Sequence, residues 1–320
     1  MSAAGTALVG ALVALGMIVV LPLGLRLLRP GVVVRPRSLG WPLVGTAGAV
    51  SLVLPQGTGA ALLAGVFALA TGVLAGCGLR LGTQAARRSA SRSAPRGSAP
   101  RLPTWSDGRV VATVVALVLP VVGAGALVAE RAGWGLLGFS GTYLALTVPH
   151  MLYAGFGAAL IAGLVAGLVH PGAGTATSSV SRAADAGAWG VPVGTLLVLV
   201  GYFTGEHVEL AGAVVLTAAL WATAWATARG PAVAAGPTAR RLLVGGAVTV
   251  GASMLLVLWW AVGEAFDVSH PGLDLMAATH GLANATGYVL CTLLGLRLAR
   301  DRARTSRGVA PSGTTRGTTP

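Results

Sequence analysis

Two histidines inside long apolar runs are the side chains of this sequence best suited to chemistry. His150 lies in the run 141–169, and His280 lies in the run 272–299. Ionisable side chains are costly in hydrocarbon, so they usually face a bundle interior and mark a substrate, proton or cofactor site. Imidazole suits zinc, iron or copper, and two imidazoles from different helices can bind one haem axially. We therefore predict a site with His150 and His280 as metal ligands, or as haem ligands. A structural hydrogen bond between helices is the equal alternative.

Polar neighbours at helical spacing extend this site along both runs. Asn284 follows His280 by four residues, so the two side chains share one helix face. The other run carries four polar side chains along one face or on its border: Tyr143, Thr147, His150 and Tyr153. Pro149 removes a backbone donor beside His150 and predicts a kink there.

A third polar group lies at the predicted start of the run 206–228, where Glu206, His207 and Glu209 follow one another closely. Acidic side chains favour helix N-termini because of the helix dipole, so capping is the alternative to ligand binding. Glu264 lies at the end of the run 241–263, where a negative charge is unfavourable. We expect Glu264 to pair with Arg131 or with a protonated histidine.

Two short segments resemble the signature segments of the YndJ-like membrane protein family: PHMLYAGF at 149–156 and MAATHGLANATGY at 276–288. Nine residues carry the resemblance: His150, Tyr153, Ala154, Gly155, Phe156, His280, Gly281, Asn284 and Ala285. Leu152 stands where the family has a second histidine, which weakens the case for a paired-histidine metal site. The resemblance covers roughly residues 108–299. It implies a membrane architecture and positions for the site, but no reaction.

The elements that must position these residues are nine apolar runs. Hydrophobic residues make up 54% of the chain and charged residues 10%, against about 25% charged residues in soluble domains. Each run is near the roughly 20 residues that cross a bilayer. We predict an all-α, polytopic transmembrane helical bundle with about nine spans, of which the second is short. The runs are 5–26, 39–55, 58–79, 108–129, 141–169, 188–203, 206–228, 241–263 and 272–299.

The arginines set the predicted orientation. All 22 basic residues are arginine, and with nine spans all but Arg131 fall on one side of the bundle. The positive-inside rule then places the N-terminus outside and the C-terminus inside, with both intramembrane histidines toward the outer face. The predicted location is the cell membrane, which the chain crosses several times.

The composition also suggests a division of the chain. We predict a three-helix N-terminal membrane part (1–80), a disordered basic cytoplasmic linker (81–107), a six-helix membrane core (108–299) and a disordered cytoplasmic tail (300–320). The lipid bilayer is the expected partner, and the arginine-rich loops should contact anionic lipids of the inner leaflet. The net charge of +13 does not indicate nucleic acid, because the arginines lie in loops between spans. The oligomeric state stays open.

The sequence does not establish a reaction or a cofactor, and whether the chain is an enzyme stays open. It has no lysine for a Walker A loop, and HExxH, CxxC and GxSxG are absent. The first hypothesis is an outward-facing intramembrane His/Asn/Glu site that binds a metal or haem. The second is a transporter or proton-coupled permease that uses the same groups, although the inner half offers few polar residues for a path. The third is a non-catalytic membrane scaffold or sensor.

Overall fold

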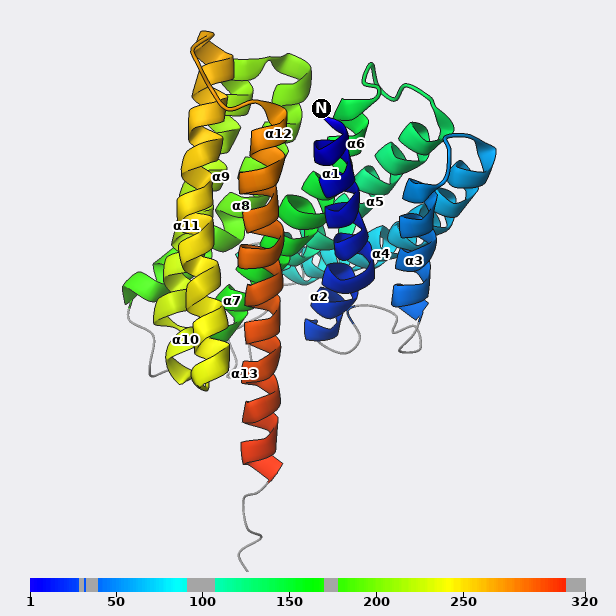
Figure 1. The fold of residues 1–320 in the computed structure, drawn as a ribbon. Helices are drawn as coiled ribbons and strands as arrows, with labels where there is room; N and C mark the ends of the chain where they lie inside the picture. The colour runs from blue at the N-terminus through cyan, green and yellow to red at the C-terminus, as the bar shows by residue number, and fades with distance from the viewer. Residues whose placement is uncertain (29–31, 33–39, 91–106, 170–177, 309–320) are drawn as a thin grey trace, which may run out of the picture.

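The computed structural model describes residues 1–28, 32, 40–90, 107–169 and 178–308, and almost all of them form helices that run along one another (Figure 1). No strand occurs within these ranges; an isolated bridge joins Leu136 and Phe139. Helices satisfy every backbone polar group within one segment, which hydrocarbon requires. Four segments are π-helical, that is, more widely wound: η1 (Gly16–Val20), η2 (Met151–Ala158), η3 (Ala277–Gly281) and η4 (Ala283–Leu290). The α-helices are α1 (Ala3–Leu15), α2 (Leu21–Leu27), α3 (Gly40–Val53), α4 (Thr58–Ala90), α5 (Gly108–Ala132), α6 (Thr142–His150), α7 (Ala159–Val169), α8 (Ser178–Thr204), α9 (Glu206–Arg229), α10 (Pro231–Ala234), α11 (Pro237–Phe266), α12 (Leu273–Met276) and α13 (Cys291–Gly308).

Eight continuous helices of the described chain are long and apolar enough to cross a membrane. They correspond to eight of the nine predicted runs and confirm a helical bundle of many spans. The remaining run forms α3, which is apolar but has only 14 residues, fewer than the roughly 20 that cross the hydrocarbon. The end of α3 lies against the end of α5. Arg131 Nη1 at the end of α5 donates to the carbonyls of Ser51 and Leu54, each at 3.2 Å.

The helix ends differ from the predicted boundaries at two places. Helix α4 continues to Ala90, so residues 81–90 are helical and the prediction of a disordered linker was wrong for them. Ala85 is buried there against Val110 and Val114 of α5, and this small side chain lets the two helices meet. Helix α13 likewise continues to Gly308, into the predicted disordered tail. The rest of the linker and tail, 91–106 and 309–320, lies outside the described residues.

The first helix packs against the part of the chain that carries the histidines. Tyr153 Oη donates to the Leu12 carbonyl at 2.8 Å. A Cβ atom on Gly24 would lie only 2.7 Å from side-chain atoms of Leu160 and Phe156, so the absence of a side chain at Gly24 allows the helices to approach closely. One hydrophobic cluster joins buried residues from α1 through α13. The core therefore extends across the predicted boundary between the three-helix and six-helix parts.

Candidate functional site

His280 is held between two neighbouring helices. Its Nδ1 lies 3.3 Å from the Ser253 carbonyl of α11, and Asn284 Nδ2 lies 3.1 Å from each ring nitrogen. Ser253 Oγ in turn donates to Asn284 Oδ1 at 2.7 Å. With the proton of a neutral ring on Nδ1, that nitrogen donates to the Ser253 carbonyl and Nε2 is left to accept from Asn284. The predicted pair of His280 and Asn284 is therefore in contact, and Ser253 is a partner that sequence reasoning missed.

His150 lies on the neighbouring helix with a more available ring. Its Nδ1 lies 2.8 Å from the Leu146 carbonyl one turn earlier, a bond that requires the proton on Nδ1 and leaves the Nε2 lone pair unused by that bond. The side chain is exposed, whereas His280 is half-buried. The segments that carry the two histidines, α6 and η3, both contact α1. The structure thus places the two residues that the sequence singled out on segments that share α1 as a neighbour, and His150 has the more exposed ring.

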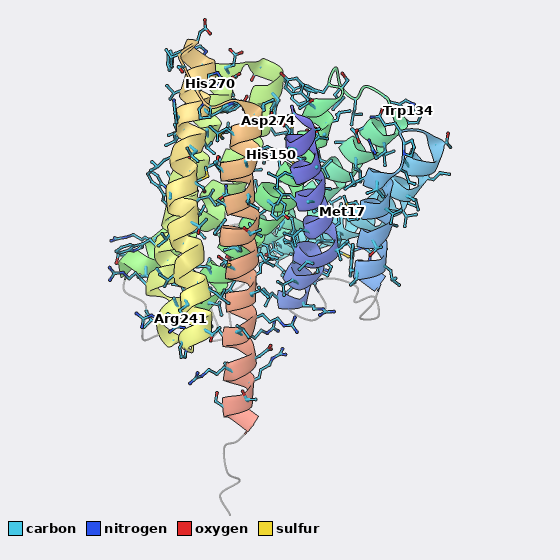
Figure 2. The ribbon with its side chains drawn as sticks, viewed as in Figure 1. Met17, Trp134, His150, Arg241, His270 and Asp274 are labelled. Carbon is cyan, nitrogen blue, oxygen red and sulfur yellow. The ribbon has the colours of Figure 1, made fainter. Side chains whose placement is uncertain are left out.

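Helix α1 completes the surroundings of the two histidines. Figure 2 shows His150 near α1, at a level along the bundle between Asp274 and Met17. A Cβ atom on Gly281 would lie 3.8 Å from Leu12, and the Ser2 backbone N–H donates to both carboxylate oxygens of Asp274 at 2.9 and 3.1 Å. Helix α1 is therefore a wall of the site, although the prediction had assigned the site to spans five and nine.

The four π-helical segments gather at this site. They interrupt three helices that contact one another, since η2 and η4 pack together and η1 touches both. His150 directly precedes η2, His280 lies in η3 and Asn284 lies in η4. Widened turns of this kind are rare and occur frequently at functional sites. Pro149 predicted the irregular turn in one of the three helices, whereas no residue pattern predicted the irregular turns in the other two.

The remaining polar residues of the predicted site lie apart from this pair or bond within their own helix. Thr147 Oγ1 donates to the Tyr143 carbonyl of its own helix, and the Tyr143 side chain is exposed. Tyr153 is buried and binds α1 through its hydroxyl. Leu152, at the position where the family has a second histidine, is buried and lies close to Gly16 of η1. That position faces the packed core, so a histidine there would meet η1.

A separate cluster forms where α9 begins and α11 ends. His270 Nε2 and Glu264 Oε1 are 3.0 Å apart, which bears out the expectation that Glu264 pairs with a histidine. The alternative partner, Arg131, binds Glu130 instead, with Nε and Oε2 2.6 Å apart. His207 lies edge-on against Phe266, with ring centroids 5.6 Å apart. Glu206 and Glu209 lie in the first turn of α9, where the helix dipole favours their charge.

A polar stripe continues from His280 along the same helix and was also missed. His280, Asn284, Tyr288 and Thr292 follow one another at intervals of four residues. Tyr288 and Thr292 are buried, and their hydroxyls have no hydrogen-bond partner among the described residues. The residues of η2 that follow His150 have apolar surroundings. Phe156 is fully buried, and Val289 of η4 fills the space beside Gly157.

The donor set is small for a metal centre. Within the described ranges, no three side chains of histidine, cysteine, aspartate or glutamate come together as a metal site would require. His150 and His280 therefore supply two imidazoles at most. Protein sites for zinc usually have three or four protein ligands, so a metal here would need water or an added ligand to complete its coordination.

Eight helices of the described residues are long and apolar enough to cross a membrane, which is typical of polytopic helical membrane proteins, and the polar contacts of His280 lie between two of them. A family model described as YndJ-like protein matches residues 11–288, and the chain belongs to this family. The match includes η1 of the first helix as well as both histidine segments, and so extends beyond the two motifs that carried the resemblance. No curated protein and no solved structure matches the chain.

Proposed function

We propose that this chain is an integral membrane protein that binds one transition-metal ion between His150 and His280. In this proposal the binding site is open on one side. The observation that supports the proposal is the position of both histidines at π-helical segments of helices that contact one another. In this proposal Nε2 of His150 binds directly, and Asn284 turns away to release Nε2 of His280. The backbone carbonyls of Leu146 and Ser253 hold the two rings by their Nδ1 atoms, as carbonyls commonly do for metal-binding histidines.

The proposed metal would have open coordination positions. Two imidazoles leave room for water and for a ligand from the outer side, and imidazole suits copper, zinc and iron. The apolar side chains of Phe156 and Val289 on the other side of the pair favour a binding site that opens one way. The same two imidazoles could instead bind a haem, and an absorption spectrum distinguishes a haem from a single metal ion.

The test is the metal content and visible spectrum of the purified full chain. The expected result is about one equivalent of metal in the wild type after cobalt loading, with a visible absorption band, and loss of both in His150→Ala and in His280→Ala. His270→Ala is the matched control, because it removes a histidine that pairs with Glu264 at the outer surface. Equal metal content in the wild type and in both site variants would refute the proposal. A Soret band in place of the cobalt band would assign the site to haem.

A crosslink tests the geometry independently of any metal. In a background with Cys77 and Cys291 replaced, cysteines at positions 150 and 280 should join through a short bifunctional reagent, because α6 and η3 both contact α1 and η2 contacts η4. The pair 150 and 241 is the control, since Arg241 lies at the far end of the bundle from His150 (Figure 2). Failure of the first pair to crosslink would remove the geometric basis of the site.

The polar stripe supports a second candidate, a proton-coupled permease. Asn284, Tyr288 and Thr292 continue from His280, and the two buried hydroxyls lack partners among the described side chains. Buried hydroxyl groups without partners are unfavourable unless water or a substrate reaches them. Tyr288→Phe would then slow proton uptake by reconstituted vesicles and leave cobalt binding unchanged, whereas the binding-site proposal expects no proton uptake by the wild type.

A further inference from the structure

Three arginines of α13 share one face of that helix. Arg297, Arg300 and Arg304 are spaced by three and four residues, which places them on one side of an α-helix. The sequence had suggested that arginine-rich loops contact lipids, but these three side chains stand on a regular helix that runs beyond the other helices of the bundle (Figure 1). A helix holds such charges at fixed spacing, whereas a loop does not.

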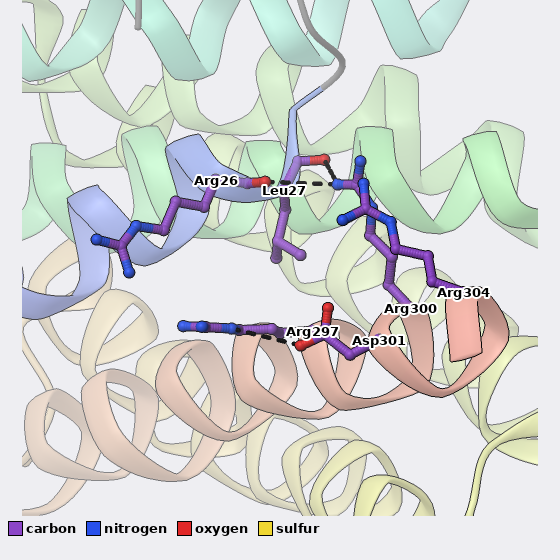
Figure 3. Close-up of a pocket in the computed structure, with 6 residues that line it drawn as sticks. All are labelled: Arg26, Leu27, Arg297, Arg300, Asp301 and Arg304. Atoms are coloured by element: carbon purple, nitrogen blue, oxygen red, sulfur yellow. Dashed lines mark hydrogen bonds and ion pairs between the residues drawn. The ribbon is translucent and has the colours of Figure 1, made fainter. Parts of the chain in front are cut away.

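This face meets the end of α2. Arg300 Nη1 lies 3.0 Å from the Leu27 carbonyl and 3.4 Å from the Arg26 carbonyl, so Arg300 donates to the terminal carbonyls of α2. Figure 3 shows a cavity between the two helices, lined by Arg26, Leu27, Arg297, Arg300, Asp301 and Arg304. Its volume is about 150 Å³, similar to an engineered protein cavity that holds benzene. A single phosphate group fits within this volume.

The charge of the cavity favours an anion. Its lining carries four guanidinium groups and one carboxylate, and Asp301 lies 3.7 Å from Arg297. Positive groups gathered in this way repel one another and attract anions. Guanidinium groups bind phosphate oxygens through two parallel hydrogen bonds, which makes a phosphate the best-matched ligand.

The position of the cavity favours a lipid as the source of this phosphate. Helix α2 ends the first apolar span, and Arg297 follows directly on the apolar part of the last one. The end of a span is the level of lipid headgroups, and basic pockets between membrane helices bind anionic headgroups. Leu27 and the aliphatic stems of the arginines add an apolar edge that a lipid can use and free phosphate cannot.

The geometry points to a binding site for the phosphate of one anionic glycerophospholipid between α2 and α13, formed by Arg26, Arg297, Arg300 and Arg304. The site lies at the end of the bundle opposite His270 and Asp274 and is independent of the proposed histidine site. A bound lipid would join the first helix to the last at this end.

The experiment is a titration of the full-length protein in neutral detergent with phosphatidylglycerol, with bound lipid counted by native mass spectrometry. Wild type should bind one lipid saturably and should not retain phosphatidylcholine in this way. Arg297→Gln and Arg304→Gln should each weaken the first binding step about fivefold, since each basic side chain near an anionic surface contributes about that factor. The double variant should weaken binding by about 25-fold if the two effects are independent.

Two controls keep the result interpretable. Arg80→Gln removes an exposed arginine of α4 outside the cavity lining, and it should change the affinity less than twofold. Arg300→Gln is not the primary variant, because it also removes the hydrogen bonds to α2 and can alter the fold. Equal weakening by Arg80→Gln, or unchanged affinity in the double variant, would overturn the site. Displacement of the lipid by millimolar inorganic phosphate would instead assign the cavity to a soluble anion and overturn the lipid assignment.

Discussion

At the scale of single residues, the site depends on how the His280 ring is oriented. Asn284 on the same helix and Ser253 on α11 bind each other and the ring, so three polar groups satisfy one another between two helices. In hydrocarbon an unpaired polar group is unfavourable, which explains why they meet. The contribution of such a network is nevertheless modest, because polar groups of an unfolded chain in the membrane also find partners.

We predict that Asn284→Leu lowers the free energy of unfolding by about 1–2 kcal/mol, and that Ser253 and Asn284 are coupled by about 0.6 kcal/mol in a double-mutant cycle with alanine. Unfolding in mixed micelles of mild detergent and dodecyl sulfate measures both values. Thr286→Val is the control, because the Thr286 hydroxyl binds the Leu282 carbonyl of its own helix. A coupling energy of zero would mean that the observed contact between Ser253 and Asn284 does not contribute to stability.

At the scale of helices, glycine determines how closely α8 and α9 approach. A Cβ atom on Gly194 would lie 2.6 Å from both the backbone nitrogen and Cα of Leu216 on α9. Backbone atoms cannot move aside as a flexible side chain does, so the helices would have to separate. Gly125 of α5 is different, since an added Cβ atom would meet nothing within 4 Å. The same residue type is therefore essential at one position and replaceable at the other.

Gly194→Ala should destabilise the protein by about 1–3 kcal/mol, the usual cost of an overpacked contact. Gly125→Ala should be neutral or stabilise by up to about 1 kcal/mol, because alanine favours a helix more than glycine does. Thermal unfolding of the two variants beside the wild type provides the comparison. If both substitutions have the same effect, close packing of α8 on α9 is not the reason for glycine at position 194.

At the scale of the whole molecule, the charges separate between the two ends of the bundle. Arg241 lies at the end where α13 projects, and Trp134, His270 and Asp274 lie at the other (Figure 2). The positive-inside rule then predicts that the arginine-rich end faces the cytoplasm and that the histidine site opens to the outside. The orientation in the membrane stays a prediction, because the fold is the same whether the arginine-rich end faces the cytoplasm or the outside.

Labelling of single cysteines tests this orientation. In a background without Cys77 and Cys291, we expect a membrane-impermeant reagent added to intact cells to label Ser269→Cys and not Pro95→Cys. Permeabilised cells should show labelling at both positions, which controls for reactivity. Labelling of position 95 from outside, without labelling of position 269, would reverse the orientation and turn the histidine site toward the cytoplasm.

The sequence by itself predicted the family and most of the helices, and it singled out His150 and His280 as candidate site residues. Apolar length predicts membrane helices because the thickness of hydrocarbon fixes how many residues a span needs. His150 and His280 stand out because ionisable groups are rare in such runs. Where helices end was predicted less well, since residues 81–90 and 300–308 are helical despite a composition rich in arginine and serine. Ala85 explains the first of these differences. Its contact partners on α5 lie more than 20 residues away in the sequence, so the local composition does not predict that this end of α4 is helical.

Only the tertiary structure decided which helices surround the histidines. Contact between Leu12 and Tyr153, far apart in sequence, makes α1 a wall of the site, and no local pattern encodes it. Ser253 became a partner of Asn284 because α11 packs beside η4, and serine in an apolar run gives no sign of its partner. The arginine cavity likewise needs α2 and α13 side by side. Spacing along one helix is fixed by its own geometry, whereas contacts between helices depend on how all of them pack.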